Sequence, residues 1–493
     1  MSRVALSASS RLALDAGAVV AERGGGSIDV AIAAAVVAMV TEPGVCAPGA
    51  GGFVTVGGRD TEPVVYDGYM TVPGLGRSST DAVVTISAEM EYGGGITTLV
   101  GPGSVATPGA WAALGMAHGN HGALPWADLV MPGARLAQDG FRLGGTSRYY
   151  LGYSHEVVFG HDPASRAALH PGGTLADVGE SITMPDLAAS LEALAERGAD
   201  WIYTGDLAGR IADDMAARGG LVTSDDLRAY RAISRAPVSL EVGDYVLSSN
   251  PAPAVGGAAV VGLLDRFLRS TRRPPDMIRA QLEIFDWRNR PSASEADRRG
   301  AVAQILASID PIRSPSTIHI SAVDETGLAC SITLSAGYGS GFIPTGTGMW
   351  MNNALGELEL VGRDLPNLVP GERLSSNMAP SVAINSEGDV LAIGSPGADR
   401  ITTALAQTVI EFCVNGRSLD ASVRAPRLHV ELEPERRVAA EPGADLSGVD
   451  LPVRAFDILH MFFGGVGAAH LGGDGSLEAI ADPRRNGAAA VVG

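Results

Sequence analysis

The first forty residues carry two apolar patterns that both predict helices. Residues 10–22 read as one helix, which Gly24–Gly26 ends. Residues 28–40 are very rich in Ala and Val, and Ser27 before them is a candidate N-cap for a second helix. Because residues 28–40 contain almost no polar position, we expect the second helix to be buried on most faces.

Further along the chain, alternating and helical patterns follow each other in short segments. They predict strands at 238–248, from Ile318, over Leu328–Leu334, at 379–385 and at 389–394, and helices within 105–141, 186–232, 258–268 and 401–413. Strands flanked by helices in this way predict antiparallel sheets covered by helices, an α+β fold. The stretch 270–316 is the most charged and least periodic, and its end at Ser314-Pro-Ser suits an exposed processing loop.

The composition predicts one large, acidic, globular unit. The chain has 493 residues, and no charge run, Ser/Pro tract or repeat marks a linker within it. The hydrophobic share of 46% is enough for a large core. A formal net charge of −19 argues against nucleic acid or an anionic membrane as a partner, because both bind basic surfaces.

The cysteines and the apolar segments bear on the cellular compartment. Cys46, Cys330 and Cys413 are widely spaced and form no Cys-x-x-Cys motif, a pattern that favours reduced thiols over a disulfide framework. No segment approaches the roughly 20 apolar residues that a membrane-spanning helix needs, and the first residues lack the pattern of a signal peptide. We therefore expect a soluble, cytoplasmic protein.

Phosphate and metal chemistry find little support in the sequence. The glycines at 49–52 precede a strand, and no Gly-Lys-Ser/Thr follows them, so close backbone packing is favoured over phosphate binding. His118 and His121 lie in a Gly-rich turn, and the chain contains no His-Glu-x-x-His motif. We expect neither a metal nor another cofactor.

The boundary at Thr317 carries the most chemical information. A polar segment ends there, and a strand with alternating side chains follows. Cleavage between Ser316 and Thr317 would place a hydroxyl nucleophile and a free α-amine on one residue. That pair can transfer acyl groups without a histidine, because the amine serves as the base. His319 lies on the same face of the strand, and we expect it to bond structurally instead of acting as the base.

A glycine-containing turn supplies a candidate oxyanion site. Gly394-Ser-Pro-Gly-Ala-Asp-Arg lies between a predicted strand and a helix N-terminus, where backbone N–H groups are free to meet a developing anion. Taken alone, the segment reads as an ordinary strand-to-helix turn. Together with Thr317, it favours an oxyanion hole.

These motifs together resemble the γ-glutamyltranspeptidase family of N-terminal-nucleophile hydrolases. The matching motifs cover nearly the whole chain: Thr41-Glu-Pro, Gly51-Gly-Phe, Pro108-Gly, Gly122-Ala-Leu-Pro-Trp, Tyr203-Thr-Gly, Gly219-Gly-Leu, Thr317-x-His-x-Ser-x-x-Asp, Gly339-Ser-Gly, Asn352-Asn353, Ser375-Ser376, Gly394-Ser-Pro-Gly and Asp482-Pro-Arg. The resemblance implies a four-layer αββα sandwich of two stacked antiparallel sheets. It also implies a precursor that cuts itself into residues 1–316 and 317–493, which stay together as one unit.

The resemblance assigns the catalytic roles residue by residue. Thr317 matches the nucleophile. Ser335 falls where the family has a second threonine that supports the nucleophile's amine, and serine keeps the hydroxyl. Gly397 and Ala398 match the paired glycines whose N–H groups bind the oxyanion, and alanine keeps that N–H if the backbone there accepts a Cβ.

The substrate pocket departs from the family pattern. Ser375 and Ser376 match the pair that contacts the γ-glutamyl α-carboxylate. The family's carboxylate-binding arginine is expected within Tyr66–Met70, where Gly68 stands and no arginine occurs. Such an arginine would recognise a carboxylate through two parallel hydrogen bonds. Three other arginines are open candidates to replace it: Arg148, Arg373 and Arg400.

The contacts to the substrate's amino group differ as well. Asn353 matches the second asparagine of the family's Asn-Asn pair, but Ala354 follows where the family has glutamine. Ala336-Gly337 replaces an asparagine, and Glu357 is the best match to the aspartate that holds the α-amino group. We therefore predict poor activity on γ-glutamyl amides.

Three functions remain open from the sequence. The first is an amidohydrolase or acyltransferase that acts on a small-molecule acyl donor other than glutathione, such as an oxamate-like amide or an acylated natural product, with water or an amine as acceptor. The second is a variant that removes a short oxalyl-type unit by C–C cleavage, as the resemblance to relatives in alkylproline antibiotic pathways implies. The third is a binding relative that never processes. Homo-oligomers are compatible with each.

Overall fold

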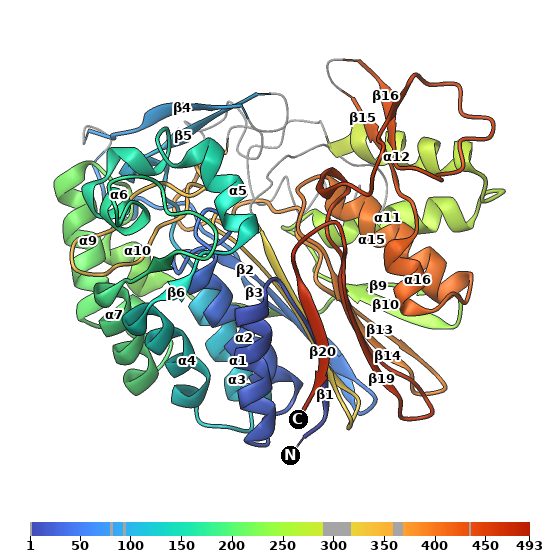
Figure 1. The fold of residues 1–493 in the computed structure, drawn as a ribbon, viewed down its shortest axis with the longest axis horizontal. Coiled ribbons are helices and arrows are strands. Elements are labelled where there is room, and N and C mark those ends of the chain that lie inside the picture. The colour runs from blue at the N-terminus through green and yellow to red at the C-terminus, as the bar shows by residue number, and fades with distance from the viewer. Residues whose placement is uncertain (1, 79–81, 92–94, 289–316, 358–367, 433–434) are drawn as a thin grey trace.

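A computed structural model of the chain describes residues 2–78, 82–91, 95–288, 317–357, 368–432 and 435–493. Ser316 and the rest of the expected processing loop therefore lie outside the described residues. Two stacked antiparallel sheets form the centre of the molecule, and helices cover both outer faces (Figure 1). The αββα sandwich expected from the sequence is confirmed.

The first sheet has seven strands in the order β20-β1-β11-β12-β2-β3-β8. Its strands are β1 (Val4–Ala8), β2 (Gly51–Gly58), β3 (Thr61–Gly68), β8 (Ile233–Arg235), β11 (Ile318–Asp324), β12 (Leu328–Ser335) and β20 (Ala488–Val492). All neighbours pair antiparallel. The strand that follows Thr317 thus lies inside the sheet, between β1 and β12.

The second sheet has six strands in the order β19-β18-β14-β13-β10-β9. Its strands are β9 (Val238–Val242), β10 (Tyr245–Ser249), β13 (Ser381–Asn385), β14 (Val390–Gly394), β18 (Gly467–Leu471) and β19 (Leu477–Ala481). Small polar side chains join the two sheets: Ser331 Oγ donates to the Ile393 carbonyl at 3.0 Å, and Thr55 Oγ1 donates to the Pro380 carbonyl at 2.8 Å. These bonds tie the sheets together at close range.

Helices pack on the outer face of each sheet (Figure 1). The first sheet carries α1 (Arg11–Glu22), α2 (Ser27–Thr41) and α3 (Ala110–His121), with α4 (Trp126–Asp139) and α7 (Pro185–Arg197) outside them. The second sheet carries α11 (Gly256–Leu268) and α15 (Arg400–Val409).

Shorter elements complete the described part of the chain. The helices are α5 (Gly145–Ser154), α6 (Pro163–Leu169), α8 (Trp201–Thr204), α9 (Asp206–Arg218), α10 (Ser224–Ala229), α12 (Pro274–Arg288) and α16 (Leu419–Arg424), with short turns η2 (Pro102–Ser104), η3 (Phe159–His161), η5 (Ile410–Val414) and η6 (Met461–Phe463). The strands are β4 (Ile86–Met90), β5 (Ile96–Val100), β6 (Phe141–Arg142), β7 (Ser181–Ile182), β15 (Leu428–Glu431), β16 (Arg437–Ala440) and β17 (Val453–Ala455).

Helix α2 is buried along its whole length, as its composition predicts, but its cap differs from the prediction. All 15 residues of α2 are buried. Gly26 is the N-cap, and Asp29 Oδ2 accepts a hydrogen bond from its N–H at 3.2 Å. Ser27 is instead the first helical residue, and its N–H and Oγ both donate to Asp324 Oδ2 at 2.9 Å. The helix N-terminus is thereby anchored to the end of β11.

Two other segments differ from the sequence expectation. Residues 238–248 form a hairpin of β9 and β10 instead of one strand, because Gly243 adopts a φ of +62° that turns the chain. Within the charged stretch from 270, residues 274–288 form α12. This helix buries Met277, Ile284 and Phe285 in the core of the second sheet, which the charged neighbours obscured in the sequence.

Candidate active site

Thr317 lies at the start of β11 and is buried, with 3% of its surface exposed. In the ladder between β11 and β12, Ile318 pairs with Leu334. One further step of this antiparallel register places Thr317 directly across from Ser335. Side chains of such directly opposed residues stand about 5 Å apart at their Cβ atoms. The strand pairing therefore brings together the two hydroxyl residues that the sequence analysis selected.

Ser335 is held in place by the end of β12. It pairs with Gly51 of β2, and its Oγ accepts a hydrogen bond from the Gly337 N–H at 3.1 Å. This bond turns the chain away from the sheet directly after the strand. The Ser335 hydroxyl therefore lies at the end of β12, next to the start of β11 where Thr317 lies.

His319 is bonded on both ring nitrogens. Nδ1 lies 2.9 Å from Thr333 Oγ1, and Nε2 lies 2.7 Å from Ser321 Oγ. Burial lowers the pKa of His319 to about 3, so the ring is neutral at working pH. The imidazole therefore orders the strands instead of taking a proton, in line with the expectation for this residue.

The turn after β14 presents two unused N–H groups. Gly397 has a φ of +130° and Ala398 a φ of +60°, and the Gly397 carbonyl accepts from the Arg400 N–H at 3.0 Å where α15 begins. Within the described ranges, no acceptor meets the N–H of Gly397 or Ala398. Ala398 thus keeps its donor by adopting a left-handed conformation that is unfavourable for a residue with a Cβ.

Glu357 and Asn353 meet beside the turn after β12. Both are buried, at 1% and 0% exposure. A Cβ on Gly337, whose φ is +63°, would lie 2.4 Å from Asn353 Oδ1 and 2.8 Å from Glu357 Oε2. Because Gly337 has no side chain, Asn353 and Glu357 can both pack next to the end of β12.

The amide of Asn353 is already used within the protein. Its Oδ1 accepts from the Tyr338 N–H at 2.8 Å. Its Nδ2 donates to Thr98 Oγ1 at 3.0 Å and to the Leu99 carbonyl at 3.1 Å. This geometry suits a residue that holds the loop after β12 in place, next to Glu357.

Gly68 lies apart from this group. A Cβ at Gly68 would lie 2.5 Å from both Ala113 Cβ and the Gly109 carbonyl oxygen. The residue therefore faces helix α3, and no side chain could project from it into a pocket.

Tyr69, the next residue, does reach the group, and sequence reasoning missed it. Burial raises the pKa of the Tyr69 phenol, the charge on Glu357 raises it further, and a hydrogen bond with Ser376 opposes both effects. The phenol thus lies beside Ser376, within electrostatic reach of the Glu357 carboxylate. The segment Tyr66–Met70 was singled out in the sequence with Gly68 as its candidate position, and Tyr69 follows directly after the end of β3.

Ser375 and Ser376 lie in the segment that leads into β13 of the second sheet. Ser376 is buried, its Oγ accepts from the Met378 N–H at 3.2 Å, and its carbonyl accepts from the Val255 N–H at 2.9 Å. Ser375 is half-buried. The pair is therefore placed on rigid backbone, with Ser376 next to the Tyr69 phenol.

The three arginines considered as a substitute clamp already have carboxylate partners. Arg373 lies 3.6 Å from Asp67, Arg148 lies 3.3 Å from Asp177, and Arg400 lies 2.5 Å from Asp399. The guanidinium of Arg373 also donates to the carbonyls of Tyr69, Asp67 and Arg231. It orders the backbone around Tyr69 and has little capacity left for a ligand.

A small cavity of about 40 Å³ adjoins Thr317 on the side of β1 and β20. Residues from distant parts of the chain line it, among them Ser9, Glu42, Thr146, Thr317, Pro396 and Arg485. Pro396 belongs to the turn that carries Gly397 and Ala398. The cavity thus links the candidate nucleophile to the candidate oxyanion turn, and its volume corresponds to about three water positions.

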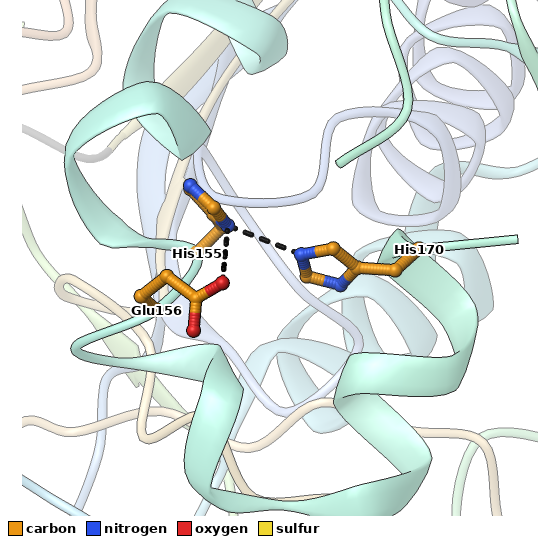
Figure 2. Close-up of side chains that lie close together, drawn as sticks. All are labelled: His155, Glu156 and His170. Carbon is orange, nitrogen blue, oxygen red and sulfur yellow. Dashed lines mark hydrogen bonds and ion pairs between the residues drawn. The ribbon is translucent and has the colours of Figure 1, made fainter. Parts of the chain in front are cut away.

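One cluster in the described residues has donors that suit a transition metal (Figure 2). His155 Nδ1 lies 3.1 Å from His170 Nε2 and 3.6 Å from Glu156 Oε1. His170 Nδ1 lies 3.0 Å from the Arg166 carbonyl, which fixes the tautomer with Nε2 facing His155. The cluster joins the ends of α5 and α6, and none of its residues lines the cavity at Thr317.

No helix in the described part of the chain is long and apolar enough to cross a membrane.

The sequence is similar to known proteins over nearly the whole chain. The sequence profile described as gamma-glutamyltranspeptidase matches residues 13–299 and 282–492. The glutathione hydrolase proenzyme of Escherichia coli (strain K12) is 26% identical, with 96% of this chain and 89% of the relative aligned. An acylase ACY 1 proenzyme of Pseudomonas sp. (strain V22) is 28% identical, with 85% and 81% aligned.

A solved structure shares the fold. The cephalosporin acylase from Bacillus halodurans superimposes with a TM-score of 0.80 at 21% identity, over 99% of this chain and 96% of the acylase. At this identity the likeness concerns the fold alone.

Proposed function

Because the chain belongs to the gamma-glutamyltranspeptidase family, we propose that it is a self-processing N-terminal threonine hydrolase or acyltransferase with an altered γ-glutamyl pocket. Its relatives are glutathione hydrolases and acylases, so the chain is an enzyme of this hydrolase type. The observation that carries the proposal is the position of Thr317. It stands across from Ser335 and shares a cavity with the turn that holds two free N–H groups.

Processing is the first proposed step. The Thr317 hydroxyl attacks the carbonyl carbon of Ser316, the acyl group moves from nitrogen to oxygen, and water hydrolyses the resulting ester. The products are residues 1–316 and 317–493, and Thr317 gains a free α-amine.

Turnover uses the same hydroxyl. The α-amine, with an ordinary pKa of about 7.7–8.0, takes the hydroxyl proton as Oγ attacks the substrate carbonyl. The N–H groups of Gly397 and Ala398 stabilise the oxyanion. The ammonium then protonates the leaving group, and an acyl-enzyme remains. Water or an amine attacks the ester carbon, the C–Oγ bond breaks, and the proton returns to Oγ.

The pocket around Tyr69 supports an acyl donor other than a γ-glutamyl amide. Gly68 stands where a carboxylate-binding arginine was expected, the next residue contributes the Tyr69 phenol, and the charge on Glu357 near that phenol would repel an α-carboxylate. We therefore propose a donor whose acyl group carries a neutral or cationic substituent at this end of the pocket.

A cytoplasmic location remains our proposal. Cys46, Cys330 and Cys413 are all buried and free, which agrees with a reducing compartment.

Intact mass spectrometry tests the proposed function. The purified wild-type protein should give two masses that correspond to 1–316 and 317–493, and Thr317→Ala should give one uncut chain. A panel of amides, including a γ-glutamyl anilide, should leave an acyl adduct on the 317–493 piece for a non-glutamyl donor. An uncut yet active enzyme, an active Thr317→Ala variant, or rapid γ-glutamyl anilide cleavage would contradict the proposal. A released oxalyl-type fragment would instead identify C–C cleavage.

A further inference from the structure

Two histidines and a glutamate turn their side-chain nitrogen and oxygen atoms toward one another where helices α5 and α6 end (Figure 2). His155 Nδ1 lies 3.1 Å from His170 Nε2 and 3.6 Å from Glu156 Oε1. The three atoms all lie within 4.8 Å of one another. None of these residues lines the cavity at Thr317, so the cluster is separate from the chemistry proposed for that residue.

The backbone fixes which nitrogen of His170 carries the proton. Its Nδ1 lies 3.0 Å from the Arg166 carbonyl, which can only accept a hydrogen bond. Nδ1 therefore holds the proton, and Nε2 of the neutral ring presents a lone pair toward His155. Metal-binding histidines usually have this arrangement, in which the second ring nitrogen donates to a carbonyl or a carboxylate.

Arg166 also orients the glutamate. Its Nη1 donates to Glu156 Oε2 at 3.0 Å, and Oε1 is the oxygen that faces His155. One arginine thus positions two members of the cluster, His170 through its carbonyl and Glu156 through its guanidinium. His155 and His170 are the C-cap residues of α5 and α6, so the backbone of each histidine is held by a helix.

A cation satisfies this arrangement better than a proton does. A proton on His155 Nδ1 can be donated to His170 Nε2 at 3.1 Å, but Glu156 Oε1 at 3.6 Å is then beyond hydrogen-bond distance. A cation between the three atoms would accept an electron pair from each. Ligands about 2.0–2.2 Å from a tetrahedral Zn²⁺ lie about 3.3–3.6 Å from one another, which is close to the two measured separations.

The types of ligand atom select the metal. Two imidazole nitrogens and a carboxylate oxygen suit Zn²⁺ and similar transition metals, whereas Mg²⁺ and Ca²⁺ prefer oxygen ligands alone. We propose that His155, Glu156 and His170 bind one Zn²⁺ ion, with water as the fourth ligand on the exposed side where Glu156 lies. The site has no local sequence motif, because η3 and α6 separate His170 from the other two ligands.

The segment between the ligands packs against residues 336–351, which follow β12. Phe159 of η3 contacts Trp350 edge to face, with ring centroids 6.1 Å apart. Ser165 Oγ accepts from Trp350 Nε1 at 2.8 Å and donates to the Gly341 carbonyl at 2.5 Å. An ion that joins the two ends of this segment would hold it against the loop after β12. The proposed role of the metal is therefore structural.

Zinc binding to the purified full-length protein without a histidine tag tests the site. After treatment with a chelator, equilibrium dialysis against ZnCl₂ should give one ion per chain, and Co²⁺ should give a visible d–d absorption band. His155→Gln, Glu156→Gln and His170→Gln should each weaken Zn²⁺ binding at least about tenfold, because loss of even a partner that orients a ligand costs this much. His161→Gln, which changes an exposed histidine of the same segment, should bind as wild type does.

Two further measurements test the structural role. Saturating Zn²⁺ should raise the Tm of the wild type and of His161→Gln, but not that of His170→Gln, because a ligand of the folded state stabilises it. Hydrogen exchange of residues 155–170 and 336–351 should slow when Zn²⁺ is added to the wild type. Circular dichroism reports whether each variant is folded, and Glu156→Gln changes an exposed side chain that the fold does not need.

Distinct results would overturn the site and its role. Absence of Zn²⁺ binding, equal binding by the wild type and the three ligand variants, or Mg²⁺ binding as tight as Zn²⁺ would overturn the metal site. Zinc binding that needs both histidines but leaves the exchange of residues 336–351 unchanged would overturn the structural role. These measurements do not depend on cleavage at Thr317, so they stand whether or not the proposed function does.

Discussion

The Nδ1 atom of His319 lies 2.9 Å from Thr333 Oγ1, so the histidine nearest to Thr317 in sequence is bonded to the neighbouring strand. Its other nitrogen is bonded to Ser321. An imidazole that is buried, neutral and hydrogen-bonded at both ring nitrogens has a structural role. The base at Thr317 must therefore be another group. This relationship predicts a pH effect on stability and none on the catalytic base.

We expect His319→Gln to remove part of the acid sensitivity of folding. The pKa of His319 is about 3 when folded and about 6.5 in the unfolded chain. Above pH 6.5 both states are neutral. Below pH 6.5 the imidazole binds a proton in the unfolded chain but stays neutral in the folded protein. The free energy of unfolding therefore falls by up to about 1.4 kcal/mol per pH unit until pH 3. When unfolding in urea is measured from pH 7.5 to 4, the free energies of unfolding of the wild type and the variant should therefore converge as the pH falls. Parallel curves would contradict the assignment.

Ser335→Ala should slow the enzyme without a comparable loss of stability. We propose that Ser335 holds the Thr317 α-amine, which becomes charged during catalysis, and losing a bond to such a group costs about 1.5–3 kcal/mol, or roughly 10- to 100-fold in kcat/KM. Ser331→Ala is the matched control, because it lies on the same strand and loses its bond to the Ile393 carbonyl. The control should lose about 1 kcal/mol of stability and keep its kinetics. Equal kinetic losses in both variants would refute a role for Ser335 at Thr317.

The turn at Gly397 and Ala398 offers a pair of opposite substitutions. Ala398→Gly relieves a left-handed alanine and retains the N–H, so we expect activity within about threefold and stability equal or up to about 1 kcal/mol higher. Gly397→Ala introduces a Cβ 2.9 Å from Gly464 Cα and should displace the donors. Its activity should fall about 100-fold, as loss of an oxyanion donor does elsewhere. Thermal unfolding and kcat report the two effects, and an inactive Ala398→Gly enzyme would count against an oxyanion turn here.

Tyr69→Phe should weaken use of the acyl donor. It removes the hydroxyl that bonds Ser376 near Glu357 and leaves buried polar groups without a partner, at a cost of about 1–3 kcal/mol. We expect kcat/KM for the donor to fall roughly 5- to 100-fold. Tyr66→Phe, three residues earlier on β3, is the control, because its hydroxyl bonds His121 and Asn120 instead. If the two variants have the same kinetics, Tyr69 does not belong to the pocket.

Local patterns in the sequence were enough to predict many elements of the fold. Helix α2 is apolar along its length and is buried along its length. The strand after Thr317 and the turn before α15 also lie where their patterns predicted them. These features depend on neighbouring residues, whose periodicity and turn chemistry are visible without the rest of the chain.

Only the tertiary structure decided which side chains meet. Gly68, the last residue of β3, faces α3, whereas Tyr69, the next residue, reaches Ser376. Glu42 and Arg485 are far apart in sequence and share one cavity. Adjacent strand residues point to opposite faces, and charges pair or remain unpaired according to what distant segments place beside them. The sequence by itself thus determined the fold and the candidate nucleophile, whereas packing between distant segments decided the pocket around it.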